Sequence, residues 1–278
     1  ARGMSRLHLD RIVQAATAPG PMTPAKASAV RALAASNDPL VASRFAHLFP
    51  QFDRAERTEA LLAALGSGPK STEALDAISG ILEVPGLDRV HELYVIQLLS
   101  RSAPHRARAE AAAWRRYFDS EPDSDSRRTA LLEVAPLLGA SANGEILRAY
   151  KESDGFIPRI ELAATLAGIP GNMEREESRN FLAGEVLPYL RERLPRETGA
   201  WLAYSGPRSP RVNPIAMTIG NLFGRFGESS DIAMLDSLGA DFMATNANWP
   251  EPLKSRIHAS LGEAAARAAD LIVLRTQR

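Results

Sequence analysis

Cysteine is absent from the 278-residue sequence. This absence excludes disulfide frameworks, cysteine-ligated zinc sites and thiol nucleophiles. The sequence also lacks an uncharged stretch of the ~20 residues that a transmembrane helix needs, and Arg6, Asp10 and Arg11 interrupt the region where a signal peptide would be apolar. We therefore expect a soluble cytoplasmic protein with no membrane partner, in which residues 1–3 are a vector remnant ahead of Met4.

An excess of charge of one sign is missing as well, because 33 basic residues balance 33 acidic residues. A protein whose main task is to grip nucleic acid is usually basic overall, so the neutral balance disfavours that class. Nearly all basic residues are arginine, since lysine occurs only at positions 26, 70, 151 and 254. This bias fits phosphate or carboxylate recognition, although we favour the simpler explanation of a GC-rich genome.

Aromatic residues make up only 6% of the chain, and valine and isoleucine are scarce beside alanine and leucine. Sheets favour β-branched and aromatic side chains, whereas alanine, leucine, arginine and glutamate favour helices. The composition therefore predicts an all-α fold.

Apolar residues recur at spacings of three and four in segment after segment, which is the period of a buried helix face. Thr23 before Pro24, and Asp53 with Glu56, predict helix starts. Helix ends are predicted at Gly66, Gly139, Gly168 and Gly239. The expected helices cover residues 5–18, 24–36, 39–49, 53–66, 71–83, 87–101, 104–118, 126–138, 143–152, 156–167, 173–193, 196–204, 211–226, 229–238, 240–247 and 251–274.

Several of these segments combine a small or acidic residue, then valine or isoleucine with arginine, then alanine and leucine. Instances are Asp38, Val41, Arg44, Ala46 and Leu48, and Ile157, Arg159, Leu162 and Ala164. The pattern resembles the second helix of the HEAT-like repeat families and covers most of the chain. The resemblance implies antiparallel helix pairs stacked as a HEAT-like α-solenoid. No linker indicates a domain boundary, so we expect a single domain over residues 1–278. An irregular multi-helix bundle is the alternative, because the repeat period is not strict.

No motif for catalysis, metal binding or cofactor binding is complete in the sequence. His91-Glu92 begins like a zinc-protease motif, but Val95 stands where the second histidine is needed. The acidic stretch from Asp119 to Asp125 has Ser124 where a calcium loop needs glycine, so we interpret it as a solvated turn before a capped helix. Gly220, Gly224 and Gly227 follow no strand, so close helix packing and a helix cap explain them better than a phosphate loop. We expect no catalytic residue, metal or cofactor.

An arginine-rich stretch with interleaved aromatics is the strongest candidate for a binding surface. Arginine pairs with phosphate, and aromatic rings stack on bases, but such runs mostly reflect solvated helix faces. A second candidate is the proline-rich loop from Ser205 to Pro214, because loops on rigid arrays often carry binding residues. The candidate residues are Arg101, Arg106, Arg108, Trp114, Arg115, Arg116, Arg127, Arg128, Arg208 and Arg211.

Stacked helices without a catalytic motif predict a non-catalytic scaffold that binds another protein on a concave helical surface. The alternative is nucleic-acid binding or DNA processing through the arginine-rich face. Some HEAT-like bacterial proteins are DNA glycosylases, but their catalytic residues find no counterpart at any position of this sequence.

Overall fold

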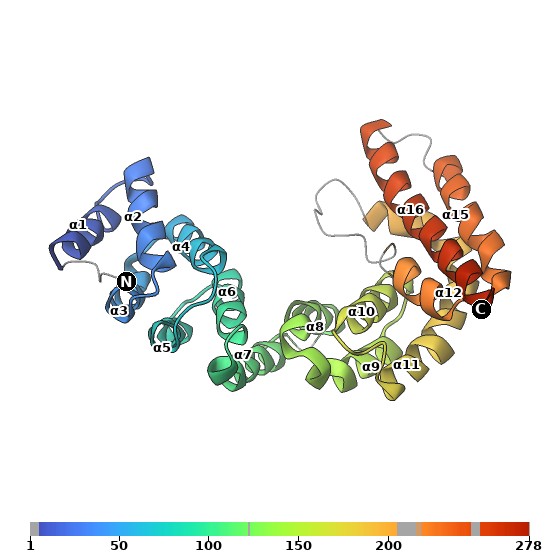
Figure 1. The fold of residues 1–278 in the computed structure, drawn as a ribbon, viewed down its shortest axis with the longest axis horizontal. Helices are drawn as coiled ribbons and strands as arrows, with labels where there is room; N and C mark the ends of the chain where they lie inside the picture. The colour runs from blue at the N-terminus through green and yellow to red at the C-terminus, as the bar shows by residue number, and fades with distance from the viewer. Residues whose placement is uncertain (1–5, 122, 205–215, 217, 246–250, 278) are drawn as a thin grey trace. The chain divides into compact units, whose positions relative to one another are not determined.

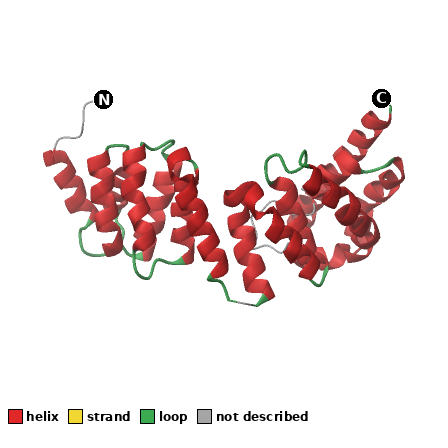
Figure 2. Cartoon of the chain, turned by 90° about the horizontal axis from the view of Figure 1, so that it is seen from below, coloured by secondary structure: helices red, strands yellow, loops and turns green. Residues whose placement is uncertain are grey.

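A computed structural model describes the chain except for residues 1–5, 122, 205–215, 217, 246–250 and 278 (Figure 1). Every element in the described residues is helical, which confirms the predicted all-α class (Figure 2). None of the described helices combines the length and apolarity that a membrane crossing requires. Contacts between residues concentrate in two compact units, Ala1–Ser120 and Glu121–Arg278, which divide at the acidic turn. The single domain over residues 1–278 stays a prediction.

The first unit contains seven α-helices among its described residues, joined by short turns. Three of these turns are 3₁₀ helices. The elements are α1 (Arg6–Ala16), α2 (Pro24–Ala35), α3 (Pro39–Leu48), η1 (Phe49–Gln51), α4 (Arg54–Gly66), α5 (Thr72–Ser79), η2 (Gly80–Glu83), α6 (Arg89–Ser100), η3 (Ala103–His105) and α7 (Arg106–Phe118).

Side-chain caps begin these helices where the sequence predicts them. The Lys26 amide donates to Thr23 Oγ1 over 3.2 Å. Asp53 and Glu56 form the expected capping box, in which each backbone amide donates to the other side chain over 2.9–3.0 Å. Because these contacts satisfy amide groups that have no partner inside the helix, local sequence determines where α2 and α4 start.

Helices that alternate along the chain pack side by side in this unit. α4 packs between α2 and α6, and α3 packs against α5. Phe45, Phe49 and Phe52 form a buried aromatic cluster in the interior, and their ring centres lie 5.8–6.5 Å apart. Apolar burial between alternate helices therefore holds the unit together.

A buried ion pair joins two of these alternate helices. Lys26 Nζ on α2 lies 2.5 Å from Glu56 Oε1 on α4, and the two side chains are 9% and 5% exposed. The same ammonium group donates to the carbonyl oxygen of Gly20 over 3.1 Å. Each buried charge thus has a partner, as burial requires.

Every element of the second unit among its described residues is helical, and the segments η5 and η6 are π-helical. Its elements are α8 (Ser124–Leu138), η4 (Gly139–Ala142), α9 (Asn143–Glu152), α10 (Phe156–Gly168), α11 (Glu176–Phe181), η5 (Leu182–Val186), α12 (Leu187–Tyr204), η6 (Ile219–Phe223), α14 (Gly224–Phe226), η7 (Ser229–Asp231), α15 (Ile232–Thr245) and α16 (Glu251–Thr276).

Two predicted helix boundaries in this unit are wrong. Pro195 lies inside α12, and α15 continues through Gly239. Buried Leu190 and Leu194 continue the apolar face of α12 up to the proline, and α15 packs along α16. An interior proline costs about 3 kcal/mol and an interior glycine about 1 kcal/mol, so we infer that packing outweighs both. The predicted ends at Gly66, Gly139 and Gly168 are confirmed.

Polar and aromatic contacts connect neighbouring helices of the second unit. α10 packs against α8, α9 and α12, and α12 packs against α15. Arg191 on α12 forms two hydrogen bonds of 2.7 and 2.9 Å with buried Asp231. The Arg159 guanidinium lies 5.4 and 5.1 Å from the ring centres of Tyr150 and Tyr189. These contacts fix the helices that carry the groove described next.

Candidate binding groove

The arginines predicted on α7 have different environments. Arg116 is buried, and its Nη1 donates to Glu92 Oε2 over 3.0 Å. Arg108 donates to Ser79 Oγ over 2.7 Å and lies 3.5 Å from Glu83. Both side chains thus hold α7 against earlier helices. Arg106 and Arg115 are exposed and have no ion pair within the part of the chain that the structure describes.

The predicted aromatic neighbour of these arginines, Trp114, is half-buried. Its ring stacks on that of Phe118, with ring centres 5.7 Å apart and an interplanar angle of 24°. Phe118 is 60% exposed. The end of α7 therefore presents an apolar ring beside exposed Arg115.

The remaining predicted residues do not lie together. Arg101 follows α6 and donates to the carbonyl oxygen of Leu65 over 2.7 Å. Arg127 and Arg128 belong to the second unit, where Arg128 lies between Asp125 and Glu161 at 3.2 and 3.3 Å. Arg208 and Arg211 fall outside the described residues. A binding surface formed by all ten residues stays a prediction.

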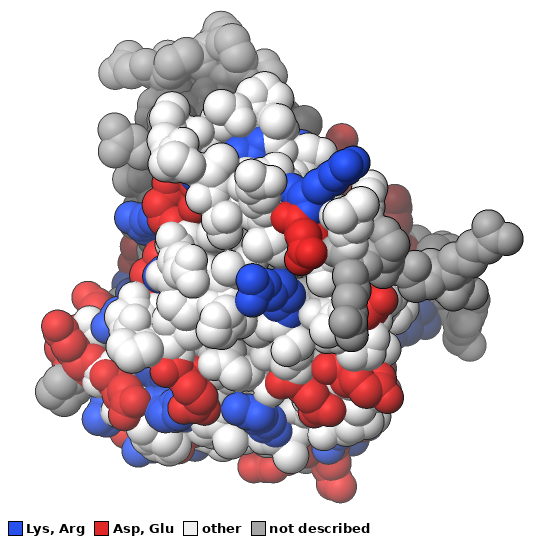
Figure 3. All heavy atoms as spheres, turned by 90° about the vertical axis from the view of Figure 1, so that its left-hand side faces the viewer, with Lys and Arg blue, Asp and Glu red and all other residues white. Residues whose placement is uncertain are grey.

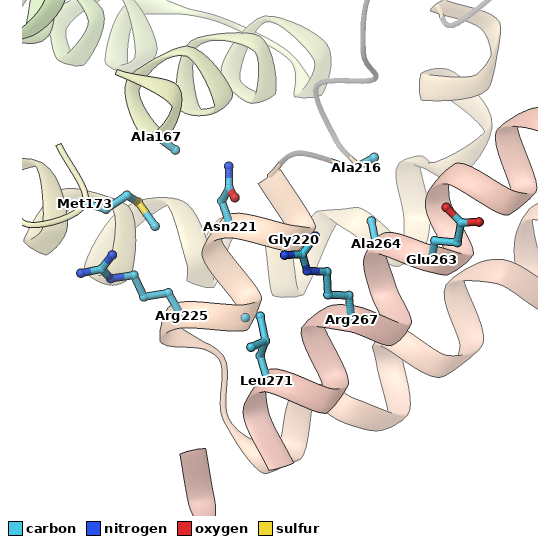
Figure 4. A pocket seen from close by; sticks show the side chains of 11 residues that line it. Ala167, Met173, Ala216, Gly220, Asn221, Arg225, Glu263, Ala264, Arg267 and Leu271 are labelled. Atoms are coloured by element: carbon cyan, nitrogen blue, oxygen red, sulfur yellow. The ribbon is translucent and has the colours of Figure 1, made fainter. Parts of the chain in front are cut away.

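A groove of about 860 Å³ opens in the second unit, and sequence reasoning did not identify it (Figure 4). It lies among α10, η6, α14 and α16. Its walls are lined by Ala167, Met173, Ala216, Gly220, Asn221, Gly224, Arg225, Glu263, Ala264, Arg267 and Leu271.

The groove is hollow because five of its lining residues are alanine or glycine. A Cβ atom on Gly224 would lie 2.8 Å from Leu271 Cδ1, so glycine permits α14 to approach α16 closely. A Cβ atom on Gly220 would meet nothing within 4 Å, which leaves that part of the groove open. Gly220 and Asn221 lie on the π-helix η6, a conformation that is rare and frequent at functional sites.

Charged and polar side chains lie along the groove. Arg225 Nη1 donates to Glu174 Oε1 over 2.8 Å, and Figure 4 shows its side chain extending toward Met173. Asn221, Glu263 and Arg267 are exposed, and none of them bonds to another described side chain. The groove therefore offers an amide, a carboxylate and a guanidinium to a ligand.

The predicted packing and capping roles are confirmed for Gly224 and Gly227 but not for Gly220, where a Cβ atom would meet nothing within 4 Å. Gly227 caps α14, and a Cβ atom there would lie 2.5 Å from the Phe223 carbonyl oxygen and 2.9 Å from Ile272 Cδ1. Gly224 and Gly227 together permit the close contact with α16. The spacing signal was therefore correct for packing, but it did not indicate the groove beside it.

A chain of hydrogen bonds in the first unit has the residue types of a hydrolase triad. Ser102 Oγ lies 3.2 Å from His105 Nδ1, and His105 Nε2 lies 2.9 Å from Asp76 Oδ1. A working triad buries its carboxylate, whereas the Asp76 side chain is 69% exposed. We interpret these hydrogen bonds as a structural link between η3 and α5.

Histidines and acidic residues elsewhere also have structural partners. Buried His91 contacts Asp88 and Thr58 at 2.9 Å each. Asp123 accepts from the Ser126 amide over 2.8 Å and so caps α8, as the acidic turn predicts. Hydrogen bonds from the Ser126 side chain and amide are the main reason that the pKa of Asp123 is lowered. Among the described residues, no cluster of histidine, aspartate or glutamate has the arrangement of a metal site.

No family model, curated protein or solved structure matches the chain. Function is therefore inferred from the geometry of the groove and its charged neighbours.

Proposed function

We propose that this chain is a non-catalytic binding protein that holds a segment of another protein in the groove of its second unit. The observation that carries the proposal is the groove itself, with small residues along its walls and Asn221, Glu263 and Arg267 exposed beside them. Its volume of about 860 Å³ is within the usual range for ligand sites. Glycine and alanine would let a partner backbone approach the helices closely.

A HEAT-like repeat architecture is part of the same proposal. Polar contacts between helices recur at similar separations along the chain: 28 residues for Arg31–Glu59, 33 for Thr58–His91 and 29 for Asn143–Asn172. Repeat proteins stack units of about 20–45 residues, each of which contacts its neighbours. The recurring separation supports this architecture over an irregular bundle.

The chemistry of the groove favours a partner segment with apolar and acidic side chains. Leu271 lines the groove and is 40% exposed, and Leu274 one turn later is 57% exposed. Two lining arginines, Arg225 and Arg267, stand against one lining carboxylate, Glu263. Arg225 already pairs with Glu174. Arg267 pairs with no described carboxylate, so it is the arginine that an acidic side chain of the partner would contact.

The test selects peptides from a displayed random library on the immobilised protein and measures their affinities by fluorescence anisotropy. The substitution Gly220→Leu fills open space in the groove, and Gly184→Leu is its matched control, because Gly184 is also an uncrowded residue of a π-helix but is exposed elsewhere. Arg267→Glu reverses the charge of one groove residue. Its matched control is Arg127→Glu, which makes the same change at an exposed site on α8, outside the groove.

We expect acidic peptides to be enriched and to lose at least about tenfold in affinity with Gly220→Leu and with Arg267→Glu, but not with the controls. Peptides that bind all four variants equally would contradict the groove as the site.

Nucleic-acid binding is the alternative, and exposed Arg106 and Arg115 on α7, the helix that carries the Trp114–Phe118 stack, are the observations that favour it. It predicts DNA binding that weakens steeply with salt, because counterions are released from phosphate. Replacing Arg106 and Arg115 with glutamine should then reduce the salt dependence. DNA binding that responds in this way would replace protein binding as the proposed function, and no binding at low salt would remove the alternative.

A further inference from the structure

A second cavity lies in the first unit, and all of its lining residues belong to that unit. Its volume is about 370 Å³, and it is lined by Gly68, Pro69, Lys70, Leu75, Leu98, Arg101 and Ser102. Two cations, from the loop before α5 and from the end of α6, therefore meet at one cavity.

Neutral oxygen atoms, not carboxylates, hold these cations. Lys70 Nζ donates to the Ser36 carbonyl oxygen over 3.2 Å and to Ser67 Oγ over 3.0 Å. Arg101 Nη1 donates to the Leu65 carbonyl oxygen over 2.7 Å. Neither cation forms an ion pair with a carboxylate among the described residues, although both line the same cavity.

Both side chains keep donors for a ligand. An ammonium group has three N–H donors and a guanidinium group has five, so Lys70 retains one and Arg101 retains four beyond the bonds above. Ser102 adds a hydroxyl group, which His105 and Asp76 hold in place. Partial burial lowers the pKa of Lys70 to about 8, as expected for a cation without an anionic partner.

We propose that this cavity binds a small phosphate-bearing anion, held by Lys70 and Arg101 with Ser102 at its edge. The anion would supply the missing counter-charge. Arginine suits phosphate because its planar group forms two parallel hydrogen bonds, and lysine suits it as a point charge. The site is separate from the proposed groove and does not depend on it.

The test uses inorganic phosphate and competitive acetylation of lysines by acetic anhydride. The neutral amine attacks an anhydride carbonyl carbon, an amide forms, and acetate and a proton leave. Bound phosphate favours the protonated ammonium of Lys70 and so slows its acetylation. Mass spectrometry reads Lys70 against exposed Lys151, which belongs to the other unit and serves as an internal control.

We expect phosphate to slow acetylation of Lys70 and not of Lys151, and Arg101→Gln to weaken the phosphate dependence about tenfold. Arg106→Gln, at an exposed arginine of the same unit, should leave it unchanged. Calorimetry with Lys70→Gln gives a second readout. Lys70 also bonds to the Ser36 carbonyl oxygen, so the Lys70 variant could fail to fold. In that case the Arg101 variant alone tests the proposal. Acetylation of Lys70 that phosphate does not slow, or an equal effect in Arg101→Gln, would overturn the proposal.

Discussion

Lys26 and Glu56 are the most deeply buried charged residues of α2 and α4, and each depends on the other for a counter-charge. Removing one partner of a buried ion pair leaves the other charge unsolvated, which costs about 3–5 kcal/mol. We therefore expect Lys26→Met to lower the free energy of unfolding by about that amount, as measured by urea denaturation.

The double variant Lys26→Met with Glu56→Gln should recover most of this loss, because no buried charge remains and glutamine can still complete the capping box. Arg31→Met is the matched control. Arg31 pairs with Glu59 across the same two helices, but the side chains are 51% and 36% exposed. Its loss should stay below about 1 kcal/mol. Equal losses for the two single variants would contradict the importance of burial.

His91 makes the stability of the first unit depend on pH. Burial lowers the pKa of His91 below its ordinary value of 6.5, and this outweighs the opposing charge of Asp88. The ring lies between Asp88 Oδ2, 2.9 Å from Nδ1, and Thr58 Oγ1, 2.9 Å from Nε2. The unfolded chain takes up the proton first as the pH falls through 6.5, so we expect the contribution of His91 to lower the free energy of unfolding below that pH.

We expect His91→Gln to remove this decrease, measured by urea denaturation at about pH 7.5 and about pH 5.5. His47→Gln, at an exposed histidine, should keep the wild-type pH dependence. If His91→Gln keeps it as well, another group carries the effect.

At the scale of the element, Gly227 at the end of α14 lies close to both η6 and α16. A Cβ atom on Gly227 would lie 2.5 Å from the backbone oxygen of Phe223, which cannot turn aside as a side chain could. Gly227→Ala should therefore lower the free energy of unfolding by about 1–3 kcal/mol, which is the usual cost of overpacking.

Gly220→Ala is the control for this prediction, because a Cβ atom there meets nothing within 4 Å. It should be neutral or should stabilise by up to about 1 kcal/mol through helix propensity. Thermal and urea denaturation of the two variants gives the comparison. A Gly227→Ala protein as stable as the unsubstituted one would show that the packing around Gly227 is looser than these distances require.

At the scale of the whole molecule, contacts concentrate in two units, Ala1–Ser120 and Glu121–Arg278. Opposite charges lie interspersed on the face that Figure 3 shows, as expected for a chain with zero net charge. Each helix is stabilised mainly by its neighbours, so we expect a local defect to remain within its unit.

Hydrogen exchange on Lys26→Met tests this expectation. Amide exchange should accelerate more in Ala1–Ser120 than in Glu121–Arg278, relative to the unsubstituted protein. Equal acceleration in both units would instead indicate the single cooperative domain that the sequence predicts.

The groove could not be read from the sequence because its parts are far apart along the chain. Ala167 and Leu271 line it from α10 and α16, more than a hundred positions apart, and neither carries a motif. The arginines were easier to see, yet sequence alone could not show that Arg116 would be buried against Glu92 whereas Arg115 would stay exposed. Adjacent residues on a helix point in different directions, and only packing decides which of them meets a neighbour.

The sequence by itself determined the helical class and many helix ends, because composition, apolar period and caps such as Thr23 and Asp53 act over a few residues. Only the tertiary structure decided that helices continue through Pro195 and Gly239, that Lys26 is buried and that a groove opens beside Gly220. The physical reason is range: caps and periodicity are properties of neighbouring residues, whereas burial and cavities depend on which distant helices come together.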